Sequence, residues 1–377
     1  MAIIKKLLVV LLGFAMVSFS LREIEITVDG ISYRFPWLPQ IGGYGCVYDI
    51  SARNGDKAQV NLQTEVEGRK VRVVCVFKSS DSLLRKLVVP KGYILVSKFW
   101  NFHNLDTVVL PSTLEVVRPD AFKGCEGLKE FRFSEKNEFL EFRDGCLLQA
   151  KHSALLYSMN GSAIPAKTRM ICKGAFANRR DTSVVFIPNS VVKIEPEAFG
   201  TNSSITKVEF SSDNKHFIFD GGNIITRRGA RLVCLLGPNC NISCKVKILG
   251  EDLFFFREDI DSICVPEGVT RIEQNCFNRS SLSYISLPSS LKDIGYGAFD
   301  CTNITSLSIP EGVGKLDNYI GCCTKLVSLS IPKSMKVVSH SVFGGCHHIK
   351  VVYMHSRDTK IEDGAFPQEA EIKYVDE

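Results

Sequence analysis

Cysteine and histidine are the residue types in this sequence that could bind a metal ion or react as nucleophiles. Cys240 and Cys244 have the spacing C-x-x-x-C, so they could pair or bind one ion, but no second ligand pair accompanies them. Near the C-terminus, four histidines accompany Cys346 and could converge if they share a face: His340, His347, His348 and His355. The sequence is repetitive, as described below, and the other repeats carry an apolar residue at the position of His348. We therefore predict neither a metal site nor a cofactor.

The fourteen cysteines would suggest disulfides in an exported protein, but their positions indicate another role. Four of them recur thirteen or fourteen residues after a repeated proline, just past the position of an A-F motif, where stacked repeats would bury them as small apolar side chains. They are Cys125, Cys301, Cys323 and Cys346.

Signs of catalysis are scarce in the rest of the chain. It contains no G-x-x-x-x-G-K-[ST], G-x-S-x-G, H-E-x-x-H or G-x-G-x-x-G motif. Neighbouring carboxylates such as Glu195 and Glu197 have no partner His or Lys at a mechanistic spacing. We therefore predict that the protein is not an enzyme, and an enzyme hypothesis depends on the late His/Cys group alone.

The elements that would position any site are repeats built on the pattern L-x-x-L-x-L-P. Measured between the prolines or the residues replacing them, the steps are 21, 23, 31, 23, 23, 32, 23, 22, 22, 22 and 22 residues, with Met354 taken as the last such residue. A short strand that cannot bury its own apolar face must stack on its neighbours. The sequence predicts about a dozen units over residues 82–377, and the two long units predict inserted hairpins at about 134–165 and 211–243.

After each proline the pattern V/L-x-x-I-x-x-x-A-F recurs, with Phe eleven residues after the proline. Two units depart from it, because Asn101 and Gly321 stand at that offset. The period, the strand pattern and A-F-x-x-C resemble the BspA-like leucine-rich repeat family, as in "FIPNSVVKIEPEAF" and "SLPSSLKDIGYGAFDC". The resemblance implies an α/β-type repeat solenoid of short parallel strands, secreted or at the cell surface and engaged in adhesion or recognition.

The N-terminal 81 residues lack the repeat. Lys5 and Lys6, an apolar run over residues 7–17 and a small-x-small site at Ser18–Ser20 predict a signal peptide over residues 1–20. Residues 21–81 alternate like strands around an Asp29-Gly30 turn and predict a β-rich cap for the open end of the solenoid. No later segment is apolar enough to span a membrane.

A partner would meet the outward side of the short strands, where side chains two residues before each proline must point. That column contains Val88, Val109, Arg132, Phe186, Glu209, Cys264, Ser286, Ser308, Ser330 and Val352. Four residues before the proline come Tyr284, Ser306 and Ser328. The late repeats therefore predict a flat Ser/Tyr strip for binding, with Phe186 and Tyr284 as its aromatic anchors, although serine can also be mere filler on a packed sheet.

These patterns support two hypotheses of different classes. The first is a non-catalytic surface or secreted protein that binds an extracellular or host-surface protein or glycan. The second is a structural spacer or envelope component with no soluble ligand. A formal net charge of +5 is too small to indicate nucleic acid, and we expect a monomer.

Overall fold

The computed structural model describes residues 23–28, 31–36, 45–50, 59–79, 83–181, 183–200, 204–237, 241–316, 319–323, 325–340 and 342–375. The predicted signal peptide and Cys240 lie outside these residues. The chain divides into two compact units, residues 1–139 and 140–377, and each is described by itself.

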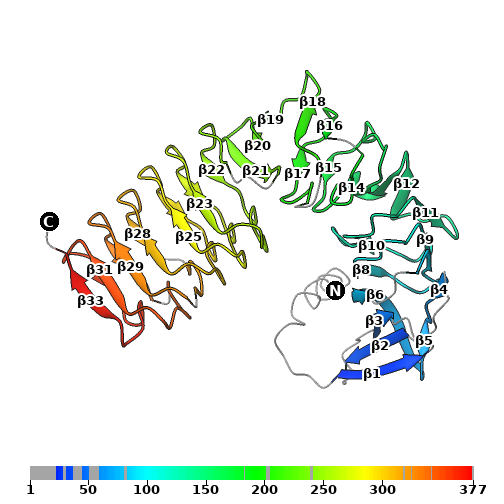
Figure 1. Cartoon of the computed structure of the whole chain (residues 1–377), viewed down its shortest axis with the longest axis horizontal. Helices are drawn as coiled ribbons and strands as arrows, with labels where there is room; N and C mark the ends of the chain where they lie inside the picture. Colours follow the sequence, from blue (N-terminus) through cyan, green and yellow to red (C-terminus); the bar gives the residue numbers. More distant parts are fainter. Residues whose placement is uncertain are drawn as a thin grey trace. The chain divides into compact units, whose positions relative to one another are not determined.

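The first unit contains a sheet that runs from the predicted cap into the first repeats (Figure 1). Its order is β1-β2-β3-β6-β8-β10, with β5 paired to β6. β1 and β2 form the antiparallel hairpin expected from the sequence, while β6, β8 and β10 are parallel. Residues 21–81 and the first repeats therefore share one sheet. Its strands are β1 (Glu23–Val28), β2 (Ile31–Pro36), β3 (Gly45–Ile50), β5 (Glu65–Val66), β6 (Arg69–Ser79), β8 (Leu95–Phe99) and β10 (Val116–Val117).

A second sheet of the first unit is a parallel ladder in the order β11-β9-β7-β4, formed by the L-x-L segments of three repeats and by β4 from residues 21–81. Its strands are β4 (Gln59–Asn61), β7 (Lys86–Val88), β9 (Thr107–Leu110) and β11 (Glu130–Phe133). In the first repeat, the Phe position predicted at Asn101 is filled by Phe99. The Phe99 N–H donates to Ala121 O at 2.6 Å, the inter-repeat bond that Phe residues make elsewhere, so this unit is shortened and not irregular.

The two long repeats of the second unit each contain three antiparallel strands, where the sequence predicted one extra hairpin. We call these the antiparallel modules, residues 140–158 and 217–235. The first has β12 (Leu140–Arg143), β13 (Cys146–Gln149), a 3₁₀ turn (Ala150–His152) and β14 (Ala154–Ser158). The second has β19 (Phe217–Asp220), β20 (Asn223–Thr226) and β21 (Arg231–Leu235).

The last strand of each antiparallel module continues in parallel into two-residue strands of the following repeats. These form an inner ladder. It comprises β15 (Met170–Ile171) and β17 (Lys193–Ile194); β22 (Ile248–Leu249), β24 (Arg271–Ile272) and β26 (Asp293–Ile294); and β28 (Lys315–Leu316), β30 (Val337–Val338) and β32 (Lys360–Ile361).

The L-x-L segments of the second unit form the outer ladder, which falls into three sheets, all parallel. The first is β16 (Val184–Ile187) with β18 (Lys207–Phe210), and the second is β23 (Ser262–Cys264) with β25 (Tyr284–Ser286). The third is β27 (Ser306–Ser308), β29 (Ser328–Ile331), β31 (Val351–Met354) and β33 (Glu371–Tyr374), drawn in orange to red in Figure 1.

The expected α/β class is wrong, because the described residues contain no α-helix. The A-F segments form consecutive turns instead. Gly297 and Cys301 adopt left-handed φ values of 64° and 56°, which interrupt a right-handed helix. Gly297 and Phe299 also donate their N–H groups to Tyr319 O and Ile320 O of the next repeat, at 2.7 and 2.8 Å, so these groups bind the neighbouring repeat. The fold is a solenoid of parallel strands.

The core is a set of columns, each with one apolar residue per repeat. Phe254, Phe277 and Phe299 stack with centroids 5.1 and 5.6 Å apart, nearly parallel. In the unit where Phe is missing, Ile320 is buried beside Gly321. A Cβ on Gly321 would lie 2.6 Å from the backbone of Phe299 and Asp300, so a larger residue has no room there.

Candidate binding surface

The outward side chains of β25, β27, β29 and β31 are mainly small hydroxyls, flanked by two tyrosines and by Val351, which lies opposite Ser328. We call this set the serine face: Tyr284, Ser286, Ser306, Ser308, Ser328, Ser330 and Tyr353. The central residue of each strand is buried, and the residues on either side of it point outward, as the alternation of a strand requires. Tyr284 exposes 57% of its surface and Tyr353 39%.

Hydrogen bonds link the serine face from repeat to repeat. Ser328 Oγ donates to Ser306 Oγ at 2.9 Å. Ser330 Oγ and His355 Nε2 lie 3.1 Å apart, and either can donate depending on the histidine tautomer. Because the side chains are short and the strands are in register, the surface offers hydroxyl donors and acceptors with little freedom to move.

Glutamates hold the turns that border the serine face. Glu267 accepts the Ser289 N–H at 2.9 Å, and this bond, with others from Ser289 and Ser290, keeps the pKa of Glu267 below its usual value. Glu311 accepts the N–H groups of Lys333 and Ser334, both at 2.9 Å. Burial raises the pKa of Glu311, but these bonds outweigh burial and lower it. Ionised carboxylates therefore tie successive turns together at neutral pH.

The last repeat is displaced by one residue from the sequence prediction. Val352 was expected to point outward, but it pairs with the core residue Leu329 and is fully buried. Tyr353 takes the outward position, and His355, not Met354, corresponds to the proline. The sequence held the signal for this, since Phe366 follows His355 by the same eleven residues that separate Pro and Phe elsewhere.

Phe186 lies on a different part of the outer ladder from Tyr284. It exposes 57% of its surface, and Val184 is exposed on the same strand. On the neighbouring strand, Val184 lies opposite Lys207 and Phe186 opposite Glu209. Lys207 and Glu209 form an ion pair at 2.7 Å. We call these four residues the phenylalanine patch. β16 and β18 form a two-stranded sheet of their own, and the second antiparallel module lies between them and β23 in the chain. The structure therefore divides the predicted site residues into two surfaces.

The late histidines do not form a joint site in the structure. His347 and His348 are exposed, the His340 ring contacts Asp363 O, and His355 contacts Ser330. Within the described ranges, no group of three His, Cys, Asp or Glu side chains is arranged to hold a metal ion.

The cysteines past the Ala-Phe pair behave as expected in three cases out of four. Cys125, Cys323 and Cys346 are buried, and burial raises the pKa of Cys125 to about 12. The Cys323 N–H donates to Cys346 Sγ at 3.2 Å, which links two repeats. Cys301 is exposed, because it lies two residues after Phe299 and not three residues after the Phe as Cys125 and Cys346 do, and Thr302 takes the buried position.

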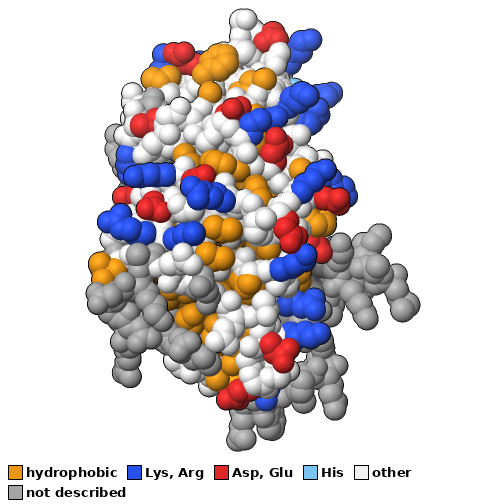
Figure 2. All heavy atoms as spheres, turned by 90° about the vertical axis from the view of Figure 1, so that its right-hand side faces the viewer, with side chains coloured by type: hydrophobic (Ala, Val, Ile, Leu, Met, Phe, Trp, Pro, Cys, Tyr) orange, Lys and Arg blue, Asp and Glu red, His pale blue; other side chains and the backbone are white. Residues whose placement is uncertain are grey.

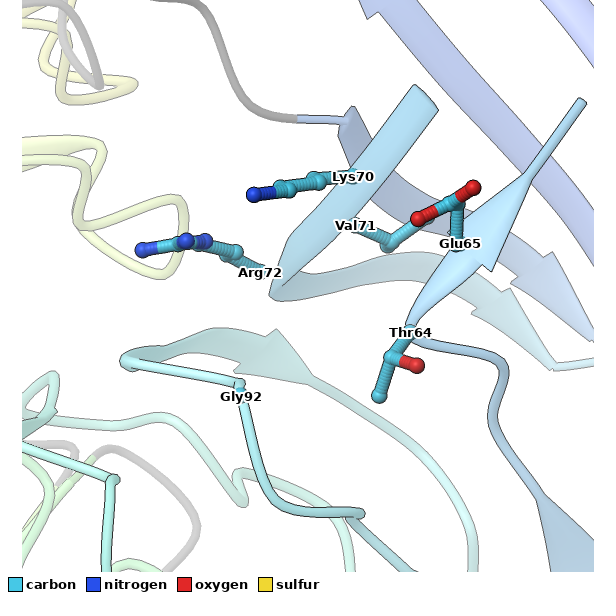
Figure 3. A pocket seen from close by; sticks show the side chains of 6 residues that line it. All are labelled: Thr64, Glu65, Lys70, Val71, Arg72 and Gly92. Atoms are coloured by element: carbon cyan, nitrogen blue, oxygen red, sulfur yellow. The ribbon is translucent and has the colours of Figure 1, made fainter. Parts of the chain in front are cut away.

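A shallow pocket in the first unit lies between β5, β6 and the turn at Gly92. Figure 3 shows that Lys70 and Arg72 extend from β6 to one side, while Glu65 and Thr64 point elsewhere. Its charged groups do not converge, so the pocket does not form a candidate site.

Charges of both signs are mixed on the surface. Figure 2 shows Lys and Arg side chains interspersed with Asp and Glu around exposed hydrophobic groups. Lys91 pairs with Glu135 at 3.1 Å and Arg271 with Asp293 at 2.9 Å. In the part of the chain that the structure describes, no helix has the length and apolar character needed to cross a membrane.

Comparison with protein-family models decides the family. The model described as "BspA type Leucine rich repeat region" matches six copies over residues 93–220 and 247–373, which together are more than half of the chain. The chain belongs to the BspA-type leucine-rich repeat family. This confirms the resemblance read from the sequence.

Solved structures also resemble this BspA-type repeat protein. A crystal structure of the pneumococcal vaccine antigen PcpA is 18% identical, with 94% of each chain covered and a TM-score of 0.44. A leucine-rich repeat protein from Eubacterium ventriosum is 16% identical, covering 94% of this chain and 96% of that one, with a TM-score of 0.47. A leucine rich cell surface protein from Faecalibacterium prausnitzii is 17% identical, covering 89% and 96%, with a TM-score of 0.40. A search of curated protein sequences found no significant match.

Proposed function

We propose that the protein is a non-catalytic recognition module, secreted or held at a cell surface, which binds an extracellular protein or glycan through the serine face. Leucine-rich repeats of this family are typically non-catalytic, and repeats suit recognition because stacking makes an extended rigid surface. The predicted signal peptide supports an exported location.

The observation that carries this proposal is the exposure of Tyr284 and Tyr353 on uncharged strands of the outer ladder, β25 of its second sheet and β31 of its third. An exposed tyrosine presents a large apolar body and a hydroxyl at low entropic cost, and aromatic residues dominate binding hot spots. The serines between them offer hydrogen bonds, so the surface suits a partner rich in hydroxyl or amide groups. Little ordering is needed on binding, because the strands and the Glu267 and Glu311 turns are already fixed.

The test is binding of the purified protein to an array of extracellular-matrix proteins and glycans at physiological salt, with Tyr284→Ala beside it. Tyr296 provides a matched control, because it is a tyrosine exposed to 55% that lies in a turn after β26 and not on the serine face. We expect saturable binding that Tyr284→Ala weakens about tenfold or more and that Tyr296→Ala leaves unchanged.

Two outcomes would contradict the proposal. Binding equally insensitive to both substitutions would place the contact on another surface. An array with no bound partner would favour the structural spacer.

A further inference from the structure

The strand β33 ends the third sheet of the outer ladder with its core side open. Within the described chain it pairs only with β31, and all four of its residues are exposed. Ile372 and Tyr374 correspond to Val352 and Met354, which are 0% and 1% exposed. Yet Ile372 is 39% exposed and Tyr374 40%. Among the described residues no further repeat covers these two core positions, although the Arg357 guanidinium lies over the Tyr374 ring, 4.4 Å from its centroid.

The backbone of β33 also presents an edge that can accept another strand. An edge strand offers a row of N–H and C=O groups that pair readily with a strand from another chain. A bulge or a proline would blunt such an edge, but Glu371–Tyr374 contains no proline and pairs with β31 without a register shift. The backbone of this short strand is therefore regular enough to pair, and its one lysine, a residue that by itself blunts an edge, is paired with Glu371.

The charges on β33 are self-complementary. Glu371 and Lys373 point outward and form an ion pair at 3.1 Å. If two copies of β33 pair antiparallel about a two-fold axis at Ile372, Glu371 of each lies opposite Lys373 of the other. A shift of two residues, the smallest that keeps side chains on the same face, puts Glu371 opposite Glu371 or Lys373 opposite Lys373. Only the central register gives attraction at both pairs.

We propose that β33 pairs with β33 of a second copy of this chain, in the register centred on Ile372, to form a symmetric dimer. The pairing gives the open backbone N–H and C=O groups of β33 hydrogen-bond partners. It also brings the two Ile372 side chains together on the core side and arranges four charges with alternating sign on the outer side. The two outer ladders then continue as one sheet. This replaces the monomer expected from the sequence, and it does not depend on the proposed ligand.

The experiment is sedimentation velocity over a concentration series at low salt, for the purified protein and for Glu371→Lys and Lys373→Glu. Each variant places like charges opposite each other at both pairs. We expect the dimer dissociation constant to rise about tenfold or more in each. Mixing the two variants pairs Lys with Glu at both contacts, so a heterodimer should form with an affinity near that of the unaltered protein. Unchanged thermal unfolding checks that the variants fold.

Three results would overturn the proposal. The first is a protein that stays monomeric over the whole series. The second is dimerisation of both variants as strong as that of the unaltered protein, which would place the interface elsewhere. The third is a mixture of the variants that remains monomeric, which would contradict the register.

Discussion

The phenylalanine patch and the serine face occupy the same side of the same ladder, but they differ in extent and chemistry. The phenylalanine patch covers two strands and combines two exposed apolar side chains with an ion pair that neutralises itself. The serine face covers four strands with hydroxyls and tyrosines. A strict period explains the difference in extent, because equal repeats bring equivalent short strands to successive positions, although β25 and β27 belong to separate sheets. An inserted antiparallel module, such as the one that follows β18 in the chain, ends such a run of equivalent strands.

The antiparallel modules show how the fold accommodates such insertions. Each is followed by an arginine that is almost fully buried and pairs in two-pronged fashion with an aspartate two residues later. Arg179 contacts Asp181 at 3.0 and 3.1 Å, and Arg257 contacts Asp259 at 2.7 and 2.8 Å. At the corresponding place, regular repeats carry Ser280 or Thr302, both buried. The repeat that follows each antiparallel module thus uses a buried ion pair where later repeats use a small side chain.

The largest expected effect is on the aromatic column beneath the regular repeats. Phe277 is fully buried between two stacked rings, so Phe277→Ala should lower the free energy of unfolding by about 3–5 kcal/mol. Among the described residues Phe176 stacks on one aromatic ring, Phe199 at 5.0 Å, with the Arg179 guanidinium 6.0 Å from its centroid, and its replacement by alanine should cost less. Chemical denaturation measures both. Equal costs would show that the continuous stack adds no stability to the regular region.

A smaller effect is expected from the buried arginine of the first antiparallel module. Arg179 also donates to Ser162 O at 2.6 Å, so Arg179→Met would remove the arginine partner of that carbonyl and leave Asp181 with only the Gly161 N–H of these partners. We expect a loss of about 2–3 kcal/mol in the free energy of unfolding. Arg271, paired with Asp293 but 54% exposed, is the control and should cost less than about 0.5 kcal/mol. A similar loss for both would mean that burial of the pair is irrelevant.

The same ion pair predicts a dependence on pH. Burial raises the pKa of Asp181, but hydrogen bonds from Arg179 and the Gly161 N–H outweigh it and hold the pKa below its usual value of 3.8. Because the folded-state pKa is the lower one, the stabilisation is complete above the unfolded-state pKa and is lost as pH falls through the folded-state value. Asp181→Asn should therefore unfold with a shallower pH dependence below about pH 4. Urea titrations at several acidic pH values test this, and parallel profiles would contradict it.

The smallest effect is expected at the ion pair of the phenylalanine patch. Lys207 and Glu209 are 55% and 52% exposed, so Lys207→Ala should change the free energy of unfolding by less than about 0.5 kcal/mol. Thermal unfolding at low and high salt is the measurement. A larger loss, removed by salt, would show that this patch is stabilised by its charges in a way the serine face is not.

Much of the solenoid could be predicted from the sequence, because L-x-x-L-x-L imposes both a period and a buried face. The outward position of Tyr284 and Ser286 follows from that alternation. The predicted helical component failed, since nothing in A-F-x-x-C reveals that left-handed residues and bonds to the next repeat break the turn. The third strand of each antiparallel module was not predicted, because an apolar run such as "ALLYS" does not indicate which strand it pairs with.

The candidate site was predicted less completely. Tyr353 and His355 were missed because the last step is 23 residues and not 22, and a slip of one residue exchanges the buried and exposed faces. Phe186 and Tyr284 are both outward by the strand pattern, two and four residues before their prolines, but they lie in separate sheets, with the second antiparallel module between them in the chain. The assignment of strands to sheets depends on pairing between segments that are distant in the sequence, and a repeat pattern does not encode that pairing.

The most direct test of the account is the dissociation constant of the partner found on the array, measured for the unaltered protein, Tyr284→Ala and Phe186→Ala. Both side chains expose 57% of their surface on the same ladder, so each controls for the other. The account predicts that Tyr284→Ala weakens binding about tenfold or more while Phe186→Ala changes it less than about twofold. The reverse order, or equal losses, would contradict the assignment of recognition to the serine face.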